Sequence, residues 1–197
     1  MAPFTNQLWD GARSERIKIP GECEEPAGLG VTSQGKENLK RIPFSTPTGG
    51  PDECIFCRIV SRKSSSNIVY EDEKYIGFLD IYPFSKGHTL VCPKEHGETI
   101  WDMKEADIAE LFQVAFKVSK AVVAAVGADG FRFVQNNGEA ANQVVAHVHV
   151  HVIPVKMEDK GRFVERKRLT LDEMEETARS IRSQMGPAQS SILGREN

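Results

Sequence analysis

From about residue 54 onward, short runs of apolar and alternating residues are separated by residues that favour turns. This pattern is typical of short strands joined by tight loops. The predicted strands are 68–71, 75–80, 88–92, 131–135 and 144–152. Because the first three follow one another through short loops, we expect an antiparallel sheet. Pro154 is expected to end the last strand, since proline cannot donate to a ladder of hydrogen bonds.

One long helix is predicted between the third and fourth strands. Apolar residues recur at helical spacing from Ile108 to Val126, which predicts an amphipathic helix. Asp102, with Glu105 three residues later, has the pattern of a capping box, so the helix is expected to open there. Gly127 is expected to end it. We assign the apolar stripe of this helix to core packing.

Two shorter helices are predicted over 54–60 and 170–183, the second opened by a capping box from Thr170 to Glu173. Residues 1–50 are rich in Gly and Pro and lack a sustained period, which predicts an extended or disordered arm. The predicted division of the chain is therefore this arm, a domain over 51–157, and a C-terminal extension over 158–197 with one helix and a frayed tail.

Composition narrows the class of partner. The 197 residues are 40% hydrophobic and 27% charged, and the net charge is −3. This leaves no large basic surface, so we expect no duplex nucleic acid partner, although a local site can still bind a small anion. No apolar run approaches the roughly 20 residues of a membrane span. We therefore expect no membrane partner and place the protein in the cytoplasm, with the nucleus as the alternative.

Three of the five histidines fall at alternate positions of the last predicted strand. Side chains alternate between the faces of a strand, so His147, His149 and His151 are expected on one face and valines on the other. Three imidazoles are poor core filler, since each buried ring nitrogen needs a partner. Same-face residues lie roughly 6–7 Å apart, whereas zinc ligand atoms lie about 2 Å from the metal. One histidine at the strand end is therefore expected to act as a ligand, which leaves the other two for chemistry.

Cys54 and Cys57 form a C-x-x-C pair, which offers two thiolates from one turn. A redox pair and two ordinary apolar cysteines are the alternatives. His96 and one strand histidine would complete a tetrahedral zinc site, and four protein ligands would make that site closed and structural. Cys92 is assigned to packing, and Cys23 is given no role.

The run His-Val-His-Val-His-Val-Ile at 147–153 resembles the signature of the histidine triad family, in which three histidines alternate with apolar residues. Other landmarks of that family occur in the same order, and together they span about half of the chain. They are Cys-Ile-Phe-Cys at 54–57, Phe-Leu-Asp-Ile at 78–81, Gly-His-Thr-Leu-Val at 87–91, Pro-Lys-Glu-His at 93–96, Asn-Asn-Gly at 136–138 and Gln143. The resemblance is to the zinc-containing, Hint-like branch of nucleotide hydrolases.

This resemblance implies an α+β fold: a five-stranded antiparallel sheet with two main helices, paired into a homodimer. It implies that His149 attacks the α-phosphate of a purine nucleotide derivative and forms a nucleotidyl-histidine intermediate, which water hydrolyses to a nucleoside monophosphate. His151 and His88 would be the phosphate-side partners of the nucleophile. His147 would orient the nucleophilic ring.

The same resemblance implies two sets of ligating residues. The nucleotide-binding set is Phe78, Asp80, Ile81, Asn136, Gln143, Val144, His149 and His151. The set that would hold a structural zinc ion is Cys54, Cys57, His96 and His147. Taken without the resemblance, Asp80 is better explained as the residue that caps the turn before Tyr82 and Pro83 than as a ribose-binding residue.

Two departures from the family pattern bear on the substrate. Val144 stands where the family often has a hydroxyl residue, which removes a contact to the phosphate or leaving group. The chain also continues for about 40 residues after the triad, without a match to a Hint-type ending. Both departures bear on rate and leaving group more than on reaction type.

The leading functional interpretation is a nucleoside phosphoramidase that cleaves the P–N bond of adenosine or guanosine 5′-phosphoramidates. A dinucleoside polyphosphate hydrolase or nucleotidyltransferase would use the same nucleophile with another leaving group. A nucleotide-binding scaffold dimer with incidental turnover is the alternative from a different class. A purely structural zinc module, a further alternative, would give no function to His88, His149 and His151.

Overall fold

The computed structural model describes residues 53–160 and 169–186. The predicted N-terminal arm and the end of the predicted tail lie outside the described residues. Within the described residues, no helix combines the length and the apolar character that crossing a membrane requires.

Five antiparallel strands form one sheet in the order β1-β2-β3-β5-β4. Their bounds are β1 Ile68–Glu71, β2 Tyr75–Leu79, β3 Thr89–Pro93, β4 Gly130–Val134 and β5 Val150–Val155. The predicted antiparallel sheet is confirmed. The first strand has the predicted bounds, and the bounds of β2, β3 and β4 differ from prediction by one residue.

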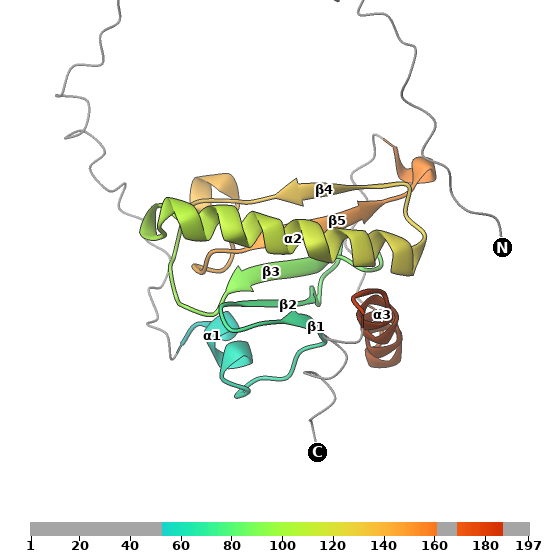
Figure 1. The fold of residues 1–197 in the computed structure, drawn as a ribbon, viewed down its shortest axis with the longest axis horizontal. Helices are drawn as coiled ribbons and strands as arrows, with labels where there is room; N and C mark the ends of the chain where they lie inside the picture. Colours follow the sequence, from blue (N-terminus) through green and yellow to red (C-terminus); the bar gives the residue numbers. More distant parts are fainter. Residues whose placement is uncertain (1–52, 161–168, 187–197) are drawn as a thin grey trace, which may run out of the picture. The chain divides into compact units, whose positions relative to one another are not determined.

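In the described parts of the chain, three α-helices and three short 3₁₀ turns accompany the sheet. The helices are α1 Ile55–Val60, α2 Glu105–Val126 and α3 Leu171–Gln184, and the turns are η2 Ile100–Asp102, η3 Glu139–Ala141 and η4 Met157–Asp159. Figure 1 shows α2 lying along the strands in front of the sheet. The predicted capping box of α3 is present: Thr170 and Glu173 satisfy each other's backbone N–H groups.

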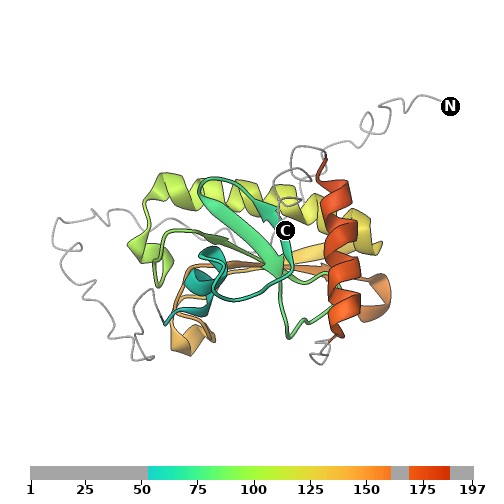
Figure 2. The same cartoon turned by 90° about the horizontal axis from the view of Figure 1, so that it is seen from below.

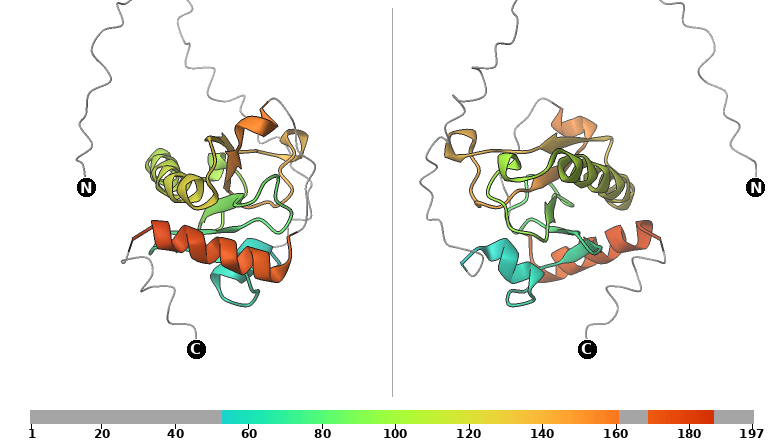
Figure 3. Two further views of the ribbon diagram at one scale, coloured as in Figure 1. Left: turned by 90° about the vertical axis from the view of Figure 1, so that its right-hand side faces the viewer. Right: turned by 60° about the vertical axis from the view of Figure 1, so that its left-hand side comes forward.

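The main core fills the space between one face of the sheet and the helices α2 and α3. Its members from the three layers are Val69, Val91, Val150 and Val152 of the strands, Leu111, Val118 and Val122 of α2, and Met174, Ala178 and Ile181 of α3. The two helices also pack against each other, with α3 crossing α2 steeply (Figure 2) and lying beside β1 (Figure 3). The C-terminal helix is therefore a part of the main core.

A smaller core joins α1 to other strand residues. Phe56 and Ile59 of α1 pack with Phe78 of β2, Leu90 of β3 and the fully buried Cys92. Burial raises the pKa of the Cys92 thiol, and the nearby Cys54 and Cys57 raise it further. Cys92 is thus a packing residue, as predicted, and this smaller core sets α1 beside the strand residues that face it.

The predicted capping box at the start of α2 is wrong by one turn. Asp102 is the last residue of a box that begins at Thr99, and its carboxylate accepts hydrogen bonds from the Thr99 backbone (2.9 Å) and hydroxyl (3.2 Å). This box caps the N-terminus of the 3₁₀ turn η2. The helix α2 begins at Glu105, three residues after Asp102, and its N-cap residue Lys104 provides no side-chain cap.

The predicted last strand is also shifted. It begins at Val150 instead of residue 144, because the preceding segment turns back on itself: the N–H of His147 bonds to the carbonyl of Val145 (2.8 Å), and that of Val148 to Gly97 (2.8 Å). The strand continues through Pro154 to Val155. Pairing with β3 ends at Val152, so the missing N–H of Pro154 interrupts no bond on that side.

Candidate functional site

The three triad histidines lie on the opposite side of the chain from the valines between them. The valines pack into the main core beneath α2: they are Val148, Val150 and Val152, all fully buried. The imidazoles of His149 and His151 line a cavity on the other face, while His147 is fully buried next to α1. Alternation along the chain thus persists from 147 to 152, although only the second half of this segment is a strand.

A row of paired residues crosses the sheet at the level of His151. Phe78 of β2 pairs with Leu90 of β3, Leu90 pairs with His151 of β5, and His151 pairs with Val134 of β4. Directly paired residues point to the same face of a sheet. The row therefore forms the floor of the cavity, with the histidine strand between the β2 side and the β4 side.

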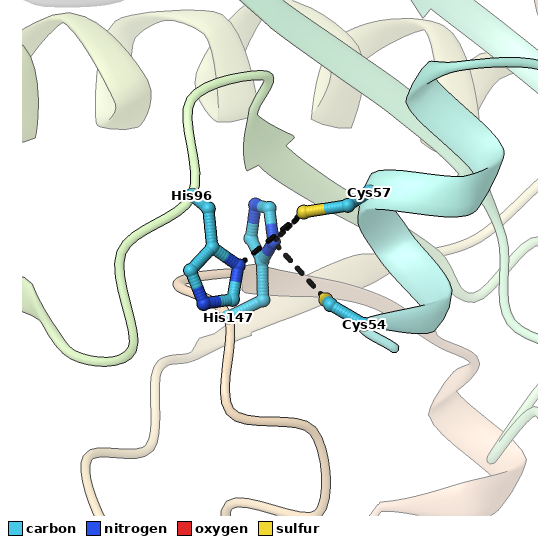
Figure 4. A group of neighbouring side chains, drawn as sticks. All are labelled: Cys54, Cys57, His96 and His147. Carbon is cyan, nitrogen blue, oxygen red and sulfur yellow. Dashed lines mark hydrogen bonds between the residues drawn. The ribbon is translucent and has the colours of Figure 1, made fainter. Parts of the chain in front are cut away.

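Four potential metal ligands converge where α1 meets the approach to β5. Figure 4 shows Cys54 and Cys57 at α1, His96 on the loop after β3, and His147 on the segment before β5, all pointing toward a common centre. Nδ1 of His147 lies 3.5 Å from Sγ of Cys54 and 3.6 Å from Sγ of Cys57. Nδ1 of His96 lies 3.3 Å from Sγ of Cys57. The four ligand atoms all lie within 4.8 Å of one another.

These residues fit a tetrahedral zinc ion on two counts. Zinc bonds of about 2.3 Å to sulfur and about 2.0–2.1 Å to nitrogen place sulfur and nitrogen ligands about 3.5 Å apart, close to the separations observed. In addition, Nε2–H of His147 donates to the carbonyl of Pro93 (2.9 Å), because a carbonyl can only accept. Nδ1 of His147 therefore carries the lone pair that a metal needs. Burial lowers the pKa of His147 to about 4, which keeps the ring neutral.

His149 is held by the backbone of its neighbour. Its Nδ1–H donates to the carbonyl of His147 (2.6 Å), so Nε2 carries the lone pair. The side chain is 4% exposed, and the ring packs edge-on against Phe56 with centroids 5.2 Å apart. Burial lowers the pKa of His149, although the hydrogen bond to His147 and the charge of Asp80 act in the opposite direction. The result is a neutral imidazole with an electron pair available on the cavity side.

His151 is held by a second histidine behind it. The backbone N–H of Phe84 donates to Nδ1 of His88 (3.3 Å), and Nε2 of His88 lies 2.9 Å from Nδ1 of His151. Since Nδ1 of His88 accepts, its proton is on Nε2 and is donated to His151. His151 then carries its own proton on Nε2. The rings of His149 and His151 are 4.8 Å apart, so a lone pair and a proton donor stand side by side.

Asp80 connects the end of β2 with this histidine pair. Its Oδ2 lies 3.4 Å from Nδ1 of His88, and its Oδ1 accepts from the backbone N–H of Tyr82 (2.8 Å). Asp80 thus caps the turn, which was the alternative to ribose binding, and it also lines the cavity. A carboxylate in this position stabilises His88 whenever that ring gains a second proton.

The cavity in front of the histidines has a volume of about 880 Å³, toward the upper end of the roughly 300–1,000 Å³ typical of small-molecule sites. The predicted nucleotide-binding residues that line it are Phe78, Asp80, Ile81, Asn136, Val144, His149 and His151. Ile81 is 53% exposed and Val144 82% exposed at its mouth. The remaining predicted residue, Gln143, is not among those lining residues.

Gln143 is buried and its amide group is fully used by the backbone. Its Oε1 accepts from the N–H of Gly138 (2.8 Å), and its Nε2 donates to the carbonyls of Glu98 (2.6 Å) and Val145 (3.0 Å). Gln143 thus braces two loops through hydrogen bonds to their backbone groups. His88, at 1% exposed, likewise lies behind His151 and not on the cavity wall.

Two further residues of the site were not identified from the sequence. Phe56 packs edge-on against both His147 and His149, and so lies between the cysteine-histidine cluster and the cavity. Phe84 contributes the N–H that sets the proton position on His88. The apolar residue inside the C-x-x-C motif was a signal for the first. No local pattern points to the second, because its contribution comes from the backbone.

Comparison with known proteins agrees with the fold. The family model "HIT domain" matches residues 61–158. An uncharacterized HIT-like protein of Methanocaldococcus jannaschii is 42% identical over 124 residues, which cover 61% of this chain and 95% of the relative. The chain belongs to the histidine triad (HIT) family.

Two relatives carry names that state an activity. Adenosine 5′-monophosphoramidase hnt1 of Schizosaccharomyces pombe is 40% identical over 108 residues, covering 55% of this chain and 78% of that protein. Adenylylsulfatase HINT3 of Arabidopsis thaliana is 38% identical over 108 residues, covering 55% of this chain and 55% of that protein.

Solved structures share the architecture. A hypothetical histidine triad nucleotide-binding protein of Sulfolobus tokodaii strain 7 has a TM-score of 0.62 at 40% identity, over 67% of this chain and 91% of its own. A zinc-bound histidine triad family protein of Mycobacterium smegmatis has a TM-score of 0.63 at 36% identity, over 75% of this chain and 100% of its own.

Proposed function

We propose that this chain is a nucleotide hydrolase that cleaves purine nucleoside 5′-phosphoramidates at the α-phosphate through a nucleotidyl-His149 intermediate. The observation that carries the proposal is the hydrogen bond from Nδ1–H of His149 to the carbonyl of His147 (2.6 Å). It leaves Nε2 as a nucleophile at the cavity. The relative named as an adenosine 5′-monophosphoramidase supports the same reaction.

The first step transfers the nucleotidyl group to the protein. Nε2 of His149 attacks the α-phosphorus, the P–N bond of the substrate breaks, and the departing amine takes the proton from Nε2 of His151. The hydrogen bond from Nε2–H of His88 to Nδ1 of His151 stabilises the negative charge that His151 carries until water restores its proton. The second step uses water: it attacks the phosphorus, the bond to His149 breaks, and the proton of water returns to His151. The products are a nucleoside monophosphate and an amine.

In this proposal the β2 side of the cavity holds the nucleoside. Asp80, at the end of β2, would accept hydrogen bonds from the ribose hydroxyls. Phe78 and Ile81 would provide apolar surface for a purine. Asn136 and the mouth residue Val144 also line the cavity, and in this proposal they would lie near the phosphate. Val144 offers no hydroxyl to the leaving group, so selectivity for it has to come from other residues.

We further propose that Cys54, Cys57, His96 and His147 hold a structural zinc ion. When bound, the ion would cross-link α1 to the approach to β5, and four protein ligands would leave no position for water. The zinc-bound family member supports this assignment.

A homodimer is also proposed. Among the described strands β4 stands at the end of the sheet and pairs with β5 alone, and Phe131 on it is 39% exposed. Sedimentation at several concentrations tests the dimer.

The proposed function is tested by trapping the intermediate. Wild-type protein mixed rapidly with adenosine 5′-phosphoramidate and quenched in base is expected to carry adenylate on His149 when its peptides are mapped by mass spectrometry. The His149→Ala variant should show no adduct and lose turnover by about 10³-fold or more, while it still binds adenylate in calorimetry. An adduct on any other residue contradicts the mechanism.

Two outcomes would favour the alternatives. Faster cleavage of a dinucleoside tetraphosphate than of the phosphoramidate, compared as kcat/KM, would favour the polyphosphate hydrolase or nucleotidyltransferase. Unchanged function of the His149→Ala variant in cells would favour the nucleotide-binding scaffold.

A further inference from the structure

The cavity contains one permanently charged cation that neither the proposed mechanism nor the nucleoside contacts use. Arg132, on β4, lines the cavity together with His149 and His151. Among the described residues that line it, Arg132 is the only lysine or arginine. No described carboxylate forms an ion pair with it. Arg132 is one of the exposed residues of β4. Because an arginine is charged at every relevant pH and carries five N–H donors, this unpaired guanidinium on the cavity wall is suited to an anionic ligand group.

The strand register fixes where Arg132 lies relative to the reacting atoms. Arg132 pairs with Ile153, and Val134 pairs with His151. Paired residues share a face, so these four side chains form one patch on the cavity side of β4 and β5. Arg132 is the diagonal neighbour of His151. Diagonal neighbours have Cα atoms about 7–8 Å apart, a gap that a long side chain can bridge.

The order of the strands places Arg132 away from the proposed nucleoside end. Phe78 and Asp80 lie at the β2 side of the histidines, whereas β4 is the strand on the other side of β5. A substrate whose nucleoside contacts Phe78 and Asp80 and whose α-phosphorus faces His149 has its leaving group on the β4 side. The cavity of about 880 Å³ includes Val134 and Asn136 on that side, which provides room for more than an unsubstituted amine.

We propose that Arg132 binds an anionic group of the leaving group and so makes this protein selective for nucleotides whose leaving group has its own negative oxygen atoms. The shared chemistry is a carboxylate, sulfate or phosphate oxygen that accepts two N–H bonds from the guanidinium. This inference rests on the proposed function and names its substrate class. Hydrolysis stays balanced: the P–N bond to such an amine breaks, a P–O bond to water forms, and the amine leaves with one proton.

A matched pair of substrates tests the proposal. Adenosine 5′-phosphoramidates of glycine and of glycinamide differ in one carboxylate, and adenosine 5′-phosphosulfate provides an oxyanion attached directly to the α-phosphate. For wild-type protein we expect a higher kcat/KM with glycine than with glycinamide. In the Arg132→Gln variant the glycine-to-glycinamide ratio should fall by about 10- to 100-fold, the range for a hydrogen-bonded charge. Arg132→Lys, which keeps the charge without the paired donors, should lose part of the ratio.

The control variant is Arg179→Gln. Arg179 lies on α3, its side chain is 74% exposed, and it is not among the cavity-lining residues; the ratio should not change. If Arg132→Gln lowers kcat/KM for the glycine conjugate alone, the anion is identified as a carboxylate on an amine. If it lowers kcat/KM for the phosphosulfate alone, the anion is identified as an oxyanion next to the α-phosphate. If Arg132→Gln leaves both the glycine-to-glycinamide ratio and the kcat/KM for the phosphosulfate as in wild type, the proposal is overturned.

Binding separates this proposal from the proposed function. The same ligands are titrated calorimetrically into His149→Ala and into His149→Ala/Arg132→Gln. This measurement reports binding and does not require either variant to hydrolyse the ligand. Weaker binding of the anionic ligands in the double variant, without wild-type hydrolysis, would support Arg132 as an anion site and reject the hydrolase. Hydrolysis by the wild type with equal binding by both variants would reject Arg132 and keep the hydrolase.

Discussion

Each cavity-facing histidine has one ring nitrogen assigned by a neighbour, and the assignments differ. His149 donates from Nδ1 to a carbonyl and keeps a lone pair on Nε2, whereas His151 accepts at Nδ1 from His88 and keeps a proton on Nε2. In the proposed mechanism, two chemically identical side chains thereby have opposite functions, nucleophile and acid. Residues around them, not the imidazoles themselves, decide which is which.

The assignment of His151 as the acid predicts a dependence on the leaving group. His151→Ala should lower kcat for adenosine 5′-phosphoramidate by about 10²–10⁴-fold, because the amine leaves with a proton. The same variant should lose far less with adenosine 5′-(p-nitrophenyl phosphate), whose leaving group departs as an anion. Single-turnover rates measure both losses. Equal losses on the two substrates would show that His151 does not donate this proton.

At the scale of residues, the sequence predicted which histidines share a face but not which backbone and side-chain groups contact them. Alternation along one segment was enough to separate His147, His149 and His151 from the valines. The role of Gln143 depends on backbone groups of Gly138 and of the distant Glu98, which no local pattern reveals. Arg132 was missed because its relation to His151 exists only through the pairing of β4 with β5.

At the scale of elements, the loop between β2 and β3 is held against α2 at one glycine. Gly87 has φ +90°, and a Cβ atom there would lie 2.8 Å from Cγ1 of Val126 on α2. It would also lie 3.5 Å from Pro154 of β5. This close approach brings the following residue, His88, against β5. The glycine is therefore part of what positions the histidine pair.

Gly87→Ala should lower the free energy of unfolding by about 2–4 kcal/mol, since it combines an unfavourable backbone conformation with an overpacked contact. Gly130→Ala is the control: a Cβ there meets no atom within 4 Å, and the change should stay within about 1 kcal/mol. Urea unfolding of both variants measures the difference. Similar free energies of unfolding for the two variants would mean that α2 can shift at Val126 without loss of stability.

The errors of element prediction have a common cause. The start of α2 and the start of β5 were both placed from local patterns, Asp102 with Glu105 and the alternating run from residue 144. In the structure Asp102 serves the preceding turn through Thr99. The segment before Val150 bends to bring His147 to α1. Contacts between distant segments override local periodicity in both places.

At the scale of the whole molecule, the cysteine-histidine cluster joins segments far apart in the chain. Cys54 and His147 are 93 residues apart, and Cys57 and His96 are 39 apart. The six-residue helix α1 packs against strand residues in the smaller core and contributes no residue to the main core. A metal ion bound by these four residues would therefore hold together parts that the main core between the sheet, α2 and α3 does not include.

Removal of zinc should lower the stability of the whole domain. Ligand binding at 100-fold above its dissociation constant contributes about 2.7 kcal/mol, so we expect chelation to reduce the free energy of unfolding by about 3 kcal/mol or more. Cys57→Ser should purify with little zinc by elemental analysis and match the chelated protein. Cys92→Ala, which removes a buried thiol outside the cluster, should retain one zinc ion per chain. Full stability after verified metal removal would contradict this structural role.

The backbone of His147 has a consequence for how the site tolerates change. Its side chain points to the cysteines, while its carbonyl accepts the hydrogen bond from His149. The substitution Cys54→His or Cys57→His changes only one ligand atom and leaves the carbonyl of His147 in place. A replacement of His147 removes a ligand atom from the cluster and also disturbs the backbone that accepts the hydrogen bond from His149, on which the tautomer of His149 depends. Engineering that aims at a different metal preference should therefore begin in the helix and leave the triad's first member untouched.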